Sequence, residues 1–227
     1  MASILKIGHR GASGYEPENT LSSFRKALEL GVNAIELDVH LCRTGEIVVI
    51  HDETVDRTTN GSGLVAEMSL EELRKFDAGN GQKIPTLAEV LRLVKGWIIV
   101  NIELKAKGTA KAVSMLLRKY RGQFLISSFD HQELKRFHQL HFMQPMFTEI
   151  RIGLLVKEIL PEHLILARDL DACSINVSME GITAESVAQV HKQGLEIFVW
   201  TVNNPEDIKR MKELGVDGIF SDYPDRL

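Results

Sequence analysis

Residues 34–39, with the sequence Ala-Ile-Glu-Leu-Asp-Val, combine an apolar β-strand with two carboxylates. Strand side chains alternate between faces, so Glu36 and Asp38 point the same way. Two like charges side by side on an apolar strand are costly unless a cation or a reaction needs them. The same alternation puts Glu103 and Lys105 on one face of a later strand. The sequence therefore predicts a metal-assisted active site at the ends of strands.

Apolar runs rich in β-branched residues alternate with helical patterns along nearly the whole chain. A βα unit taken eight times in 227 residues predicts a (β/α)₈ TIM-type barrel, with an open doubly wound sheet as the alternative. Polar groups that follow the ends of many different strands favour the barrel, because barrel sites gather there. The expected barrel strands are 4–8, 34–39, 98–104, 124–128, 152–156, 173–177, 196–202 and 217–221.

Capping patterns predict where several helices begin and end. Thr86-x-x-Glu89 and Asp130-x-x-Glu133 each have the spacing of a capping box. A later helix is expected to begin after Asn204, with Pro205 at its first position, and to end at Gly215.

One further strand-like segment, residues 46–50, follows the second strand too closely to be parallel to it. We therefore expect an antiparallel hairpin with a two-residue turn at Thr44-Gly45, which would place His51 opposite Asp38. A polar insertion after the second barrel strand, at about 52–85, follows. It includes one short helix that Ser69 is expected to cap. Residues 1–227 otherwise predict a single barrel domain.

Composition narrows the class of protein. The chain is 44% apolar and 26% charged, with a formal net charge of −4, which argues against a general nucleic-acid binder. Cys42 and Cys173 lack CxxC spacing and predict free thiols in a reducing compartment. The first strand begins too early to leave room for a signal peptide, and no apolar run is long enough to span a membrane. A cytoplasmic protein without stable membrane association is expected.

Three carboxylates form the candidate metal site: Glu36, Asp38 and Glu103. A solvent-facing role would suit an exposed edge strand, but barrel strands are buried on both faces. The three carboxylates offer only oxygen ligands and no cysteine lies nearby, which favours one divalent cation, Mg²⁺ or Ca²⁺, over zinc.

Two histidines at strand ends, His9 and His51, predict a general acid and base, since imidazole titrates near neutral pH. Arg10 and Lys105 predict an anion beside the metal, and phosphate suits a forked guanidinium and a point charge. Trp200, which ends a strand, either walls the cleft or packs in the core.

Several strings occur in an order that resembles bacterial glycerophosphodiester phosphodiesterases, and the resemblance covers essentially the whole chain. They are His9-Arg10-Gly11, Glu16-Pro17-Glu18-Asn19-Thr20, Glu36-Leu37-Asp38-Val39, Val48-Val49-Ile50-His51-Asp52, Arg57-Thr58-Thr59-x-Gly61, Ile84-Pro85-Thr86-Leu87, Glu103-Leu104-Lys105, Val199-Trp200-Thr201-Val202-Asn203 and Gly218-Ile219-Phe220-Ser221-Asp222.

The resemblance implies a barrel with a small insertion after its second strand and metal-dependent hydrolysis of a small-molecule glycerophosphodiester to glycerol 3-phosphate and an alcohol. The site roles carried over by motif are an acid/base pair, His9 and His51; metal ligands, Glu36, Asp38 and Glu103; phosphate binders, Arg10 and Lys105; and Glu18, which orients Arg10 or contacts the glycerol. Trp200, from its place at a strand end, is a further candidate for substrate binding. The alternatives are lysophospholipase D or phosphoinositide phospholipase C-like activity, and a non-catalytic phosphodiester-binding barrel. The alcohol, the preferred ion, the role of each histidine and the nucleophile, water or a substrate hydroxyl, stay open at this point.

Overall fold

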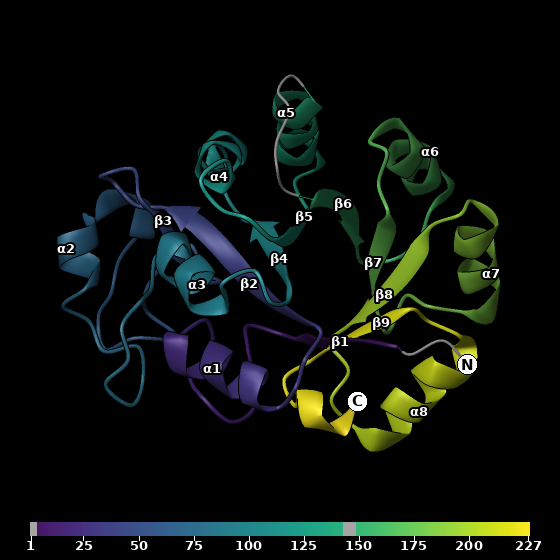
Figure 1. Cartoon of the computed structure of the whole chain (residues 1–227), viewed down its shortest axis with the longest axis horizontal. Coiled ribbons are helices and arrows are strands. Elements are labelled where there is room, and N and C mark those ends of the chain that lie inside the picture. The colour runs from purple at the N-terminus through teal and green to yellow at the C-terminus, as the bar shows by residue number, and fades with distance from the viewer. Residues whose placement is uncertain (1–3, 143–148) are drawn as a thin grey trace.

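A computed structural model of the chain describes residues 4–142 and 149–227. Eight parallel strands close into a ring, because β1 pairs with both β2 and β9, and helices surround it (Figure 1). This confirms the predicted (β/α)₈ barrel, and the expected strand bounds agree with the observed ones to within three residues. The parallel strands are β1 (Leu5–Gly8), β2 (Ala34–Leu41), β4 (Ile99–Leu104), β5 (Gln123–Ser128), β6 (Glu149–Val156), β7 (Ser174–Ser178), β8 (Glu196–Trp200) and β9 (Gly218–Ser221).

The helices begin and end largely where the capping residues predict. Thr86 and Glu89 form the expected capping box, and Gly215 ends the last long helix with a φ of 80°. The helices are α1 (Leu21–Glu29), α2 (Leu70–Leu73), α3 (Leu87–Val94), α4 (Thr109–Leu117), α5 (His131–Phe142), α6 (Pro161–Asp169), α7 (Ala184–Lys192) and α8 (Pro205–Leu214).

Glu133 departs from its predicted role. Asp130 does cap α5, accepting a hydrogen bond from the Glu133 backbone at 3.2 Å. The buried Glu133 carboxylate, however, accepts hydrogen bonds from the backbone of Gly108 (3.0 Å) and Ala110 (3.1 Å), and Arg136 pairs with its other oxygen. It therefore caps the neighbouring helix α4, whose own residue at that position, Gly108, has no side chain to do so.

The largest apolar cluster contains residues from both the strands and the surrounding helices, and a smaller one takes a residue from each of five strands: Ile7, Ala34, Leu125, Phe198 and Phe220. Ala34 shares a face of β2 with Glu36 and Asp38. The smaller cluster therefore forms an apolar layer inside the barrel, below the carboxylates that lie nearer the C-terminal ends of the strands.

The hairpin forms with a register one residue away from the predicted one. Strand β3 (Ile47–Val49) pairs antiparallel with β2, but its turn contains three residues, 43–45, between the bonded pair Cys42 and Glu46. Gly45 has a φ of 90°, as this longer turn requires. Ile50, and not His51, therefore lies opposite Asp38, to whose carbonyl it donates a 3.0 Å hydrogen bond.

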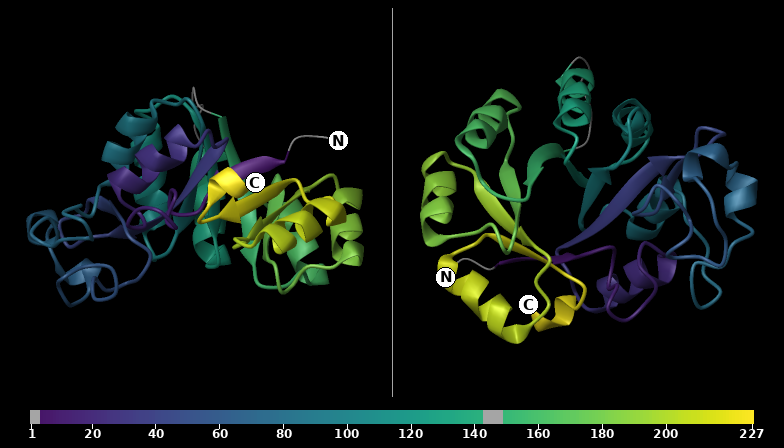
Figure 2. Two further views of the ribbon diagram at one scale, coloured as in Figure 1. Left: turned by 90° about the horizontal axis from the view of Figure 1, so that it is seen from below. Right: turned by 180° about the vertical axis from the view of Figure 1, so that it is seen from behind.

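The segment between β3 and α3 lies to one side of the barrel (Figure 2). It contains a short 3₁₀ turn, Val65–Glu67, and α2, which begins with the expected capping box of Ser69 and Glu72. Its buried side chains form an apolar cluster with Cys42 and Val48 of the hairpin: Ile50, Val55, Val65, Leu73, Ala78 and Ile84. This packing gives the segment a fixed position beside β2, close to the C-terminal ends of the strands.

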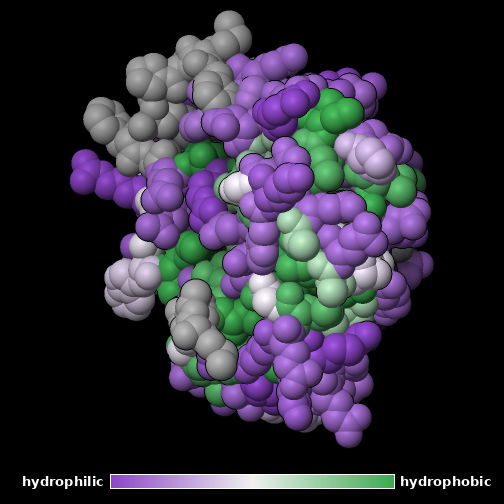
Figure 3. All heavy atoms as spheres, turned by 90° about the vertical axis from the view of Figure 1, so that its right-hand side faces the viewer, coloured by the Kyte–Doolittle hydropathy of each residue, from purple (hydrophilic) through white to green (hydrophobic). Residues whose placement is uncertain are grey.

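The outer surface carries polar and apolar side chains intermixed, as the face in Figure 3 shows. Within residues 4–142 and 149–227, no helix has both the length and the apolar character needed to cross a membrane. Cys42 and Cys173 are free thiols, as predicted.

Candidate active site

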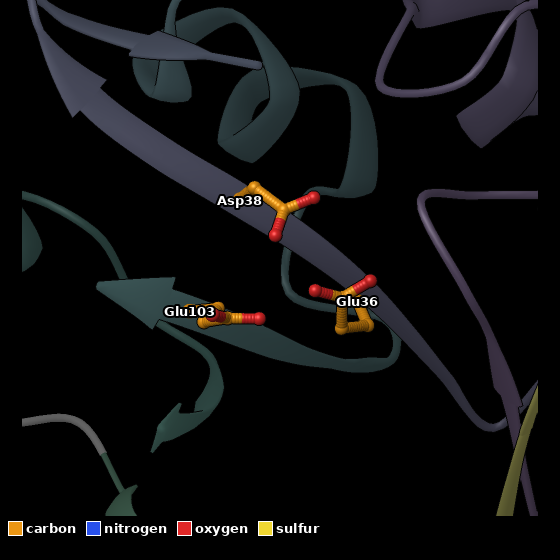
Figure 4. Close-up of side chains that lie close together, drawn as sticks. All are labelled: Glu36, Asp38 and Glu103. Carbon is orange, nitrogen blue, oxygen red and sulfur yellow. The ribbon is translucent and has the colours of Figure 1, made fainter. Parts of the chain in front are cut away.

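The three predicted metal ligands lie together. Glu36 and Asp38 project from β2 and Glu103 from the adjacent β4, where it is in register with Asp38 (Figure 4). One oxygen from each carboxylate lies within 4.8 Å of the others. Asp38 is 1% exposed and Glu36 4%. Parallel pairing of β2 with β4 thus concentrates three negative charges in a buried space.

The electrostatics of this cluster favour a cation. Burial, together with the charges of Asp38 and Glu103, raises the pKa of Glu36 well above its usual range. Burial and the charge of Asp38 likewise raise the pKa of Glu103. Burial opposes ionisation of Asp38 too, but the charges of Arg10 and Lys105 outweigh it and lower the pKa of that carboxyl. The positive charges of the protein alone are therefore too few to keep Glu36 and Glu103 fully ionised, and a bound cation would supply what is missing.

The two predicted phosphate-binding cations border the cluster. Lys105 Nζ lies 2.8 Å from Glu103 Oε1 and 3.6 Å from Asp38 Oδ1. Arg10 Nε lies 3.4 Å from Asp38 Oδ2, and the Arg10 backbone N–H donates to Glu36 at 2.9 Å. The φ of Arg10 is 54°, in the left-handed region that side chains rarely adopt, so the turn after β1 is held by these contacts.

His9, just after β1, is oriented by a carboxylate from the other end of the chain. Its Nδ1 lies 2.7 Å from Asp222 Oδ1, directly after β9, and β1 pairs with β9. Asp222 also accepts hydrogen bonds from Ser13 (2.7 Å) and Asn203 (2.6 Å). Burial alone would raise the pKa of Asp222, but the hydrogen bond and charge of His9 and the other donors lower it to about 2. An ionised carboxylate accepts only, so His9 carries a proton on Nδ1.

His51 has a similar arrangement, with a carboxylate partner at its Nδ1. Its Nδ1 lies 2.6 Å from Asp52 Oδ1, and its Nε2 lies 3.1 Å from Lys105 Nζ. An ammonium only donates and a carboxylate only accepts, so the proton is on Nδ1 and the lone pair on Nε2. Burial lowers the pKa of His51 in spite of the nearby Asp38 and Asp52. The imidazole is therefore neutral and able to accept a proton at Nε2.

Glu18 lies where the sequence places it, beside Arg10, but it also has a second partner. Its Oε1 accepts hydrogen bonds from Arg10 Nη1 and from Arg57 Nη2, both at 2.8 Å. Sequence reasoning assigned no role to Arg57, to Asp52 or to Asp222. All three residues do belong to the sequence motifs by which the chain resembles glycerophosphodiester phosphodiesterases. Their partners, however, are identified only by the fold.

A cavity of about 140 Å³ opens between these groups. The two histidines, Arg10, Lys105, Glu36 and Glu103 line one part of it, and four apolar side chains line another: Phe129, Leu155, Trp200 and Phe220. The Trp200 indole N–H donates to the Asn176 carbonyl at 3.1 Å, so its ring presents an apolar wall and not a phosphate donor. Phe129 packs edge-on against it, with ring centroids 5.6 Å apart.

Comparison with known proteins shows the family of the chain. The model of the glycerophosphoryl diester phosphodiesterase family matches residues 9–226. The glycerophosphodiester phosphodiesterase of Caldanaerobacter subterraneus subsp. tengcongensis is 41% identical, with 98% of this chain and 96% of the relative covered. That of Bacillus altitudinis is 37% identical, with 97% and 95% covered.

Solved structures of phosphodiesterases share the fold of this chain. A phosphodiesterase of Oleispira antarctica, in complex with its product sn-glycerol-3-phosphate, aligns with a TM-score of 0.90 and 30% identity over 97% of this chain and 93% of that one. The glycerophosphodiester phosphodiesterase of Thermotoga maritima aligns with a TM-score of 0.84 and 31% identity over 99% and 97%.

Proposed function

Because the chain belongs to the glycerophosphoryl diester phosphodiesterase family and is a phosphoric diester hydrolase acting on glycerophosphodiesters, we propose that this cavity performs the reaction. Two histidines, each with its own carboxylate partner, line one cavity together with Glu36, Glu103 and two cations, and Asp38 completes the carboxylate cluster beside it. This convergence carries the proposal. The products are glycerol 3-phosphate and an alcohol.

Glu36, Asp38 and Glu103 would hold one divalent cation, Mg²⁺ or Ca²⁺. Their donor set fits such an ion, because it is all oxygen and two of its carboxyls have raised pKa values that a cation would lower. When bound, the ion would supply positive charge to the phosphoryl oxygens.

Arg10 and Lys105 would neutralise the remaining charge of the phosphodiester. Both lie at the carboxylate cluster and line the cavity, and their side chains are each 17% exposed. Charged donors in such a water-poor site stabilise the additional charge that the phosphoryl group gains in the transition state. Glu18 would keep the Arg10 guanidinium in place through its 2.8 Å ion pair.

The histidines would move the protons. His51, neutral with its Nε2 lone pair toward Lys105, suits the base that takes a proton from the attacking hydroxyl, water or the glycerol of the substrate. His9 would enter the reaction protonated on both ring nitrogens, as an imidazolium that Asp222 stabilises. It would donate its Nε2 proton to the leaving alkoxide oxygen as the bond from that oxygen to phosphorus breaks. Trp200 and Phe129 would form the apolar wall beside the substrate.

Metal-stripped enzyme assayed on glycerophosphocholine, glycerophosphoethanolamine and glycerophosphoglycerol, with Mg²⁺ or Ca²⁺ added back, tests the proposal. Release of glycerol 3-phosphate that depends on the added ion is expected. Release of the head-group alcohol from lysophospholipids that rises with acyl-chain length would instead favour lysophospholipase D activity. Binding of the diesters with no turnover under any of these conditions would favour a non-catalytic barrel.

Two histidine variants separate the proton-transfer roles. His9→Ala and His51→Ala should each reduce turnover by on the order of 10² or more while the protein stays folded. On a nitrophenyl phosphodiester, whose leaving group needs no proton, His9→Ala should recover and His51→Ala should not. The reverse pattern would exchange the two roles, and near-normal turnover in either variant would remove that histidine from the mechanism.

We further propose that residues 1–227 act as one catalytic domain and that the insertion at about 52–85 serves the site by supplying Arg57. The small-molecule substrate is the partner the cavity supports. The cytoplasmic location stays a prediction.

A further inference from the structure

A continuous chain of hydrogen bonds runs from His51, the second histidine, to Arg10, the first phosphate-binding side chain. His51 contacts Asp52, Asp52 contacts Arg57, Arg57 contacts Glu18 and Glu18 contacts Arg10. The two ends of this chain line the cavity. Its middle member, Arg57, does not.

The Arg57 guanidinium engages both carboxylates through two hydrogen bonds each. Nε and Nη2 donate to the two Asp52 oxygens at 2.7 and 3.0 Å, while Nη1 and Nη2 donate to the two Glu18 oxygens at 2.8 Å. Bidentate pairs of this kind fix orientation as well as charge. The hydrogen bond from Arg57 is also the largest cause that lowers the pKa of Asp52, so this carboxylate stays an acceptor for His51.

The partners of Arg57 come from separate parts of the fold. Asp52 directly follows His51 after the hairpin, whereas Glu18 belongs to the loop between β1 and α1, 39 residues away from Arg57 in sequence. In the part of the chain that the structure describes, the hydrogen bonds of Arg57 join these two loops. One side chain thus sets the position of two groups that must act on the same phosphodiester.

We propose that Arg57 is a positioning residue that fixes His51 and Arg10 relative to each other. It acts on His51 through Asp52 and on Arg10 through Glu18. The inference rests on the proposed function, since it concerns how that site is assembled. Lysine should not replace arginine here, because an ammonium is a point donor and cannot reach four carboxylate oxygens in one plane.

Arg57→Ala and Arg57→Lys, measured against Arg43→Ala, test the proposal. Arg43 is a matched control, because it lies in the turn between β2 and β3, is similarly exposed and pairs with Glu72 at 2.8 Å, away from the cavity. Arg57→Ala should lose on the order of 10² in kcat/KM, as expected for misplaced groups, and Arg57→Lys should recover little of it. Arg43→Ala should retain the wild-type value.

Each arm can be measured separately by combining Arg57→Ala with Asp52→Asn or Glu18→Gln. Asp52→Asn should mainly lower kcat, because it affects His51, and Glu18→Gln should mainly raise KM, because it affects Arg10. Each double variant should be barely worse than its worse single parent, since residues that act through one another are not additive. Fully additive losses would contradict the proposed coupling.

A readout without turnover guards against loss of folding as the explanation. Long-range ¹H–¹⁵N spectra report the imidazole tautomer, and the His51 signals can be assigned by their absence in His51→Ala. Wild-type His51 should carry its proton on Nδ1, and Arg57→Ala should populate both tautomers while the thermal unfolding midpoint stays close to that of Arg43→Ala.

The outcomes keep the two hypotheses apart. If the wild-type protein hydrolyses none of the glycerophosphodiesters, the proposed function fails, whatever Arg57 does. If the wild type is active and either Arg57→Ala or Arg57→Lys keeps the full kcat/KM of Arg43→Ala, the positioning role is refuted and the proposed function stands. An unchanged His51 tautomer in Arg57→Ala would refute the arm through Asp52 alone.

Discussion

The pairing of Asp222 with His9 makes a prediction about stability as well as catalysis. The pKa of Asp222 falls from an ordinary value of 3.8 to about 2 in the folded protein. At about 1.4 kcal/mol per pKa unit, the ionised carboxylate contributes about 2 kcal/mol of stability at neutral pH. Asp222→Asn removes this contribution, which corresponds to roughly 4–8 °C in Tm for a chain of this length.

The sign of the pH dependence follows from the lowered pKa. Stability from Asp222 is fully present above the unfolded pKa of 3.8 and is lost as the pH falls through the folded value of about 2. The difference between wild type and Asp222→Asn should therefore be constant from pH 7 to pH 5. It should shrink to roughly half at pH 3. Any cost of a poorer hydrogen bond in the variant does not change with pH and adds a constant.

Urea unfolding of both proteins at pH 7, 5 and 3 gives the differences directly. Turnover should also fall by on the order of 10², because a side-chain amide can donate as well as accept and so no longer holds the His9 proton on Nδ1. Asp217→Asn is the matched control: Asp217 precedes the same strand, β9, at its opposite end and pairs with His191 at 2.8 Å. A stability difference at pH 3 as large as that at pH 7 would refute the reasoning, as would a full loss of turnover in the control.

Three further predictions concern the metal and the helix ends. Glu103→Gln should bind the divalent ion more weakly, as measured by calorimetry, and should lose activity that excess ion restores only in part. The activity of the wild type should vanish in EDTA, and activity that survives EDTA would argue against the metal site. Glu133→Ala should lose about 1–3 kcal/mol in urea unfolding, because Gly108 and Ala110 lose their acceptor, while turnover per folded molecule stays the same. Thr86→Ala should cost about 1 kcal/mol in the same measurement through loss of the capping box, and an unchanged midpoint would contradict this.

Much of the barrel could be predicted because its signals are local. The strand runs, the Thr86 capping box and the helix end at Gly215 can each be recognised from a few residues that are close together in the sequence. Glu36 and Asp38 share a face by alternation alone, and Glu103 joins them once β2 and β4 are neighbours. The hairpin register was wrong by one residue, because Gly45 allows a three-residue turn as readily as a two-residue one.

The partners of the histidines could not be predicted in the same way. His9 and Asp222 are 213 residues apart, and only closure of the barrel through β1 and β9 brings them together. Glu133 is a second case in which the sequence did not reveal the partner of a charged side chain. Its spacing from Asp130 fits a local capping box, but its carboxylate caps helix α4 instead. A charged side chain's partner depends on tertiary neighbours, and spacing alone does not determine it.

Arg57 shows what this means for the insertion. A long polar insertion at this end of a barrel is typical of a lid or a specificity loop. Its arginine instead contacts Asp52 and Glu18, whose other partners are His51 and Arg10. The apolar cluster fixes the backbone of the insertion at Val55, near Arg57. The hydrogen bonds of Arg57 to two carboxylates then oppose the entropy of its long side chain. The insertion therefore acts as a rigid support for the site, and its contribution should appear in the tautomer of His51 and the KM set by Arg10.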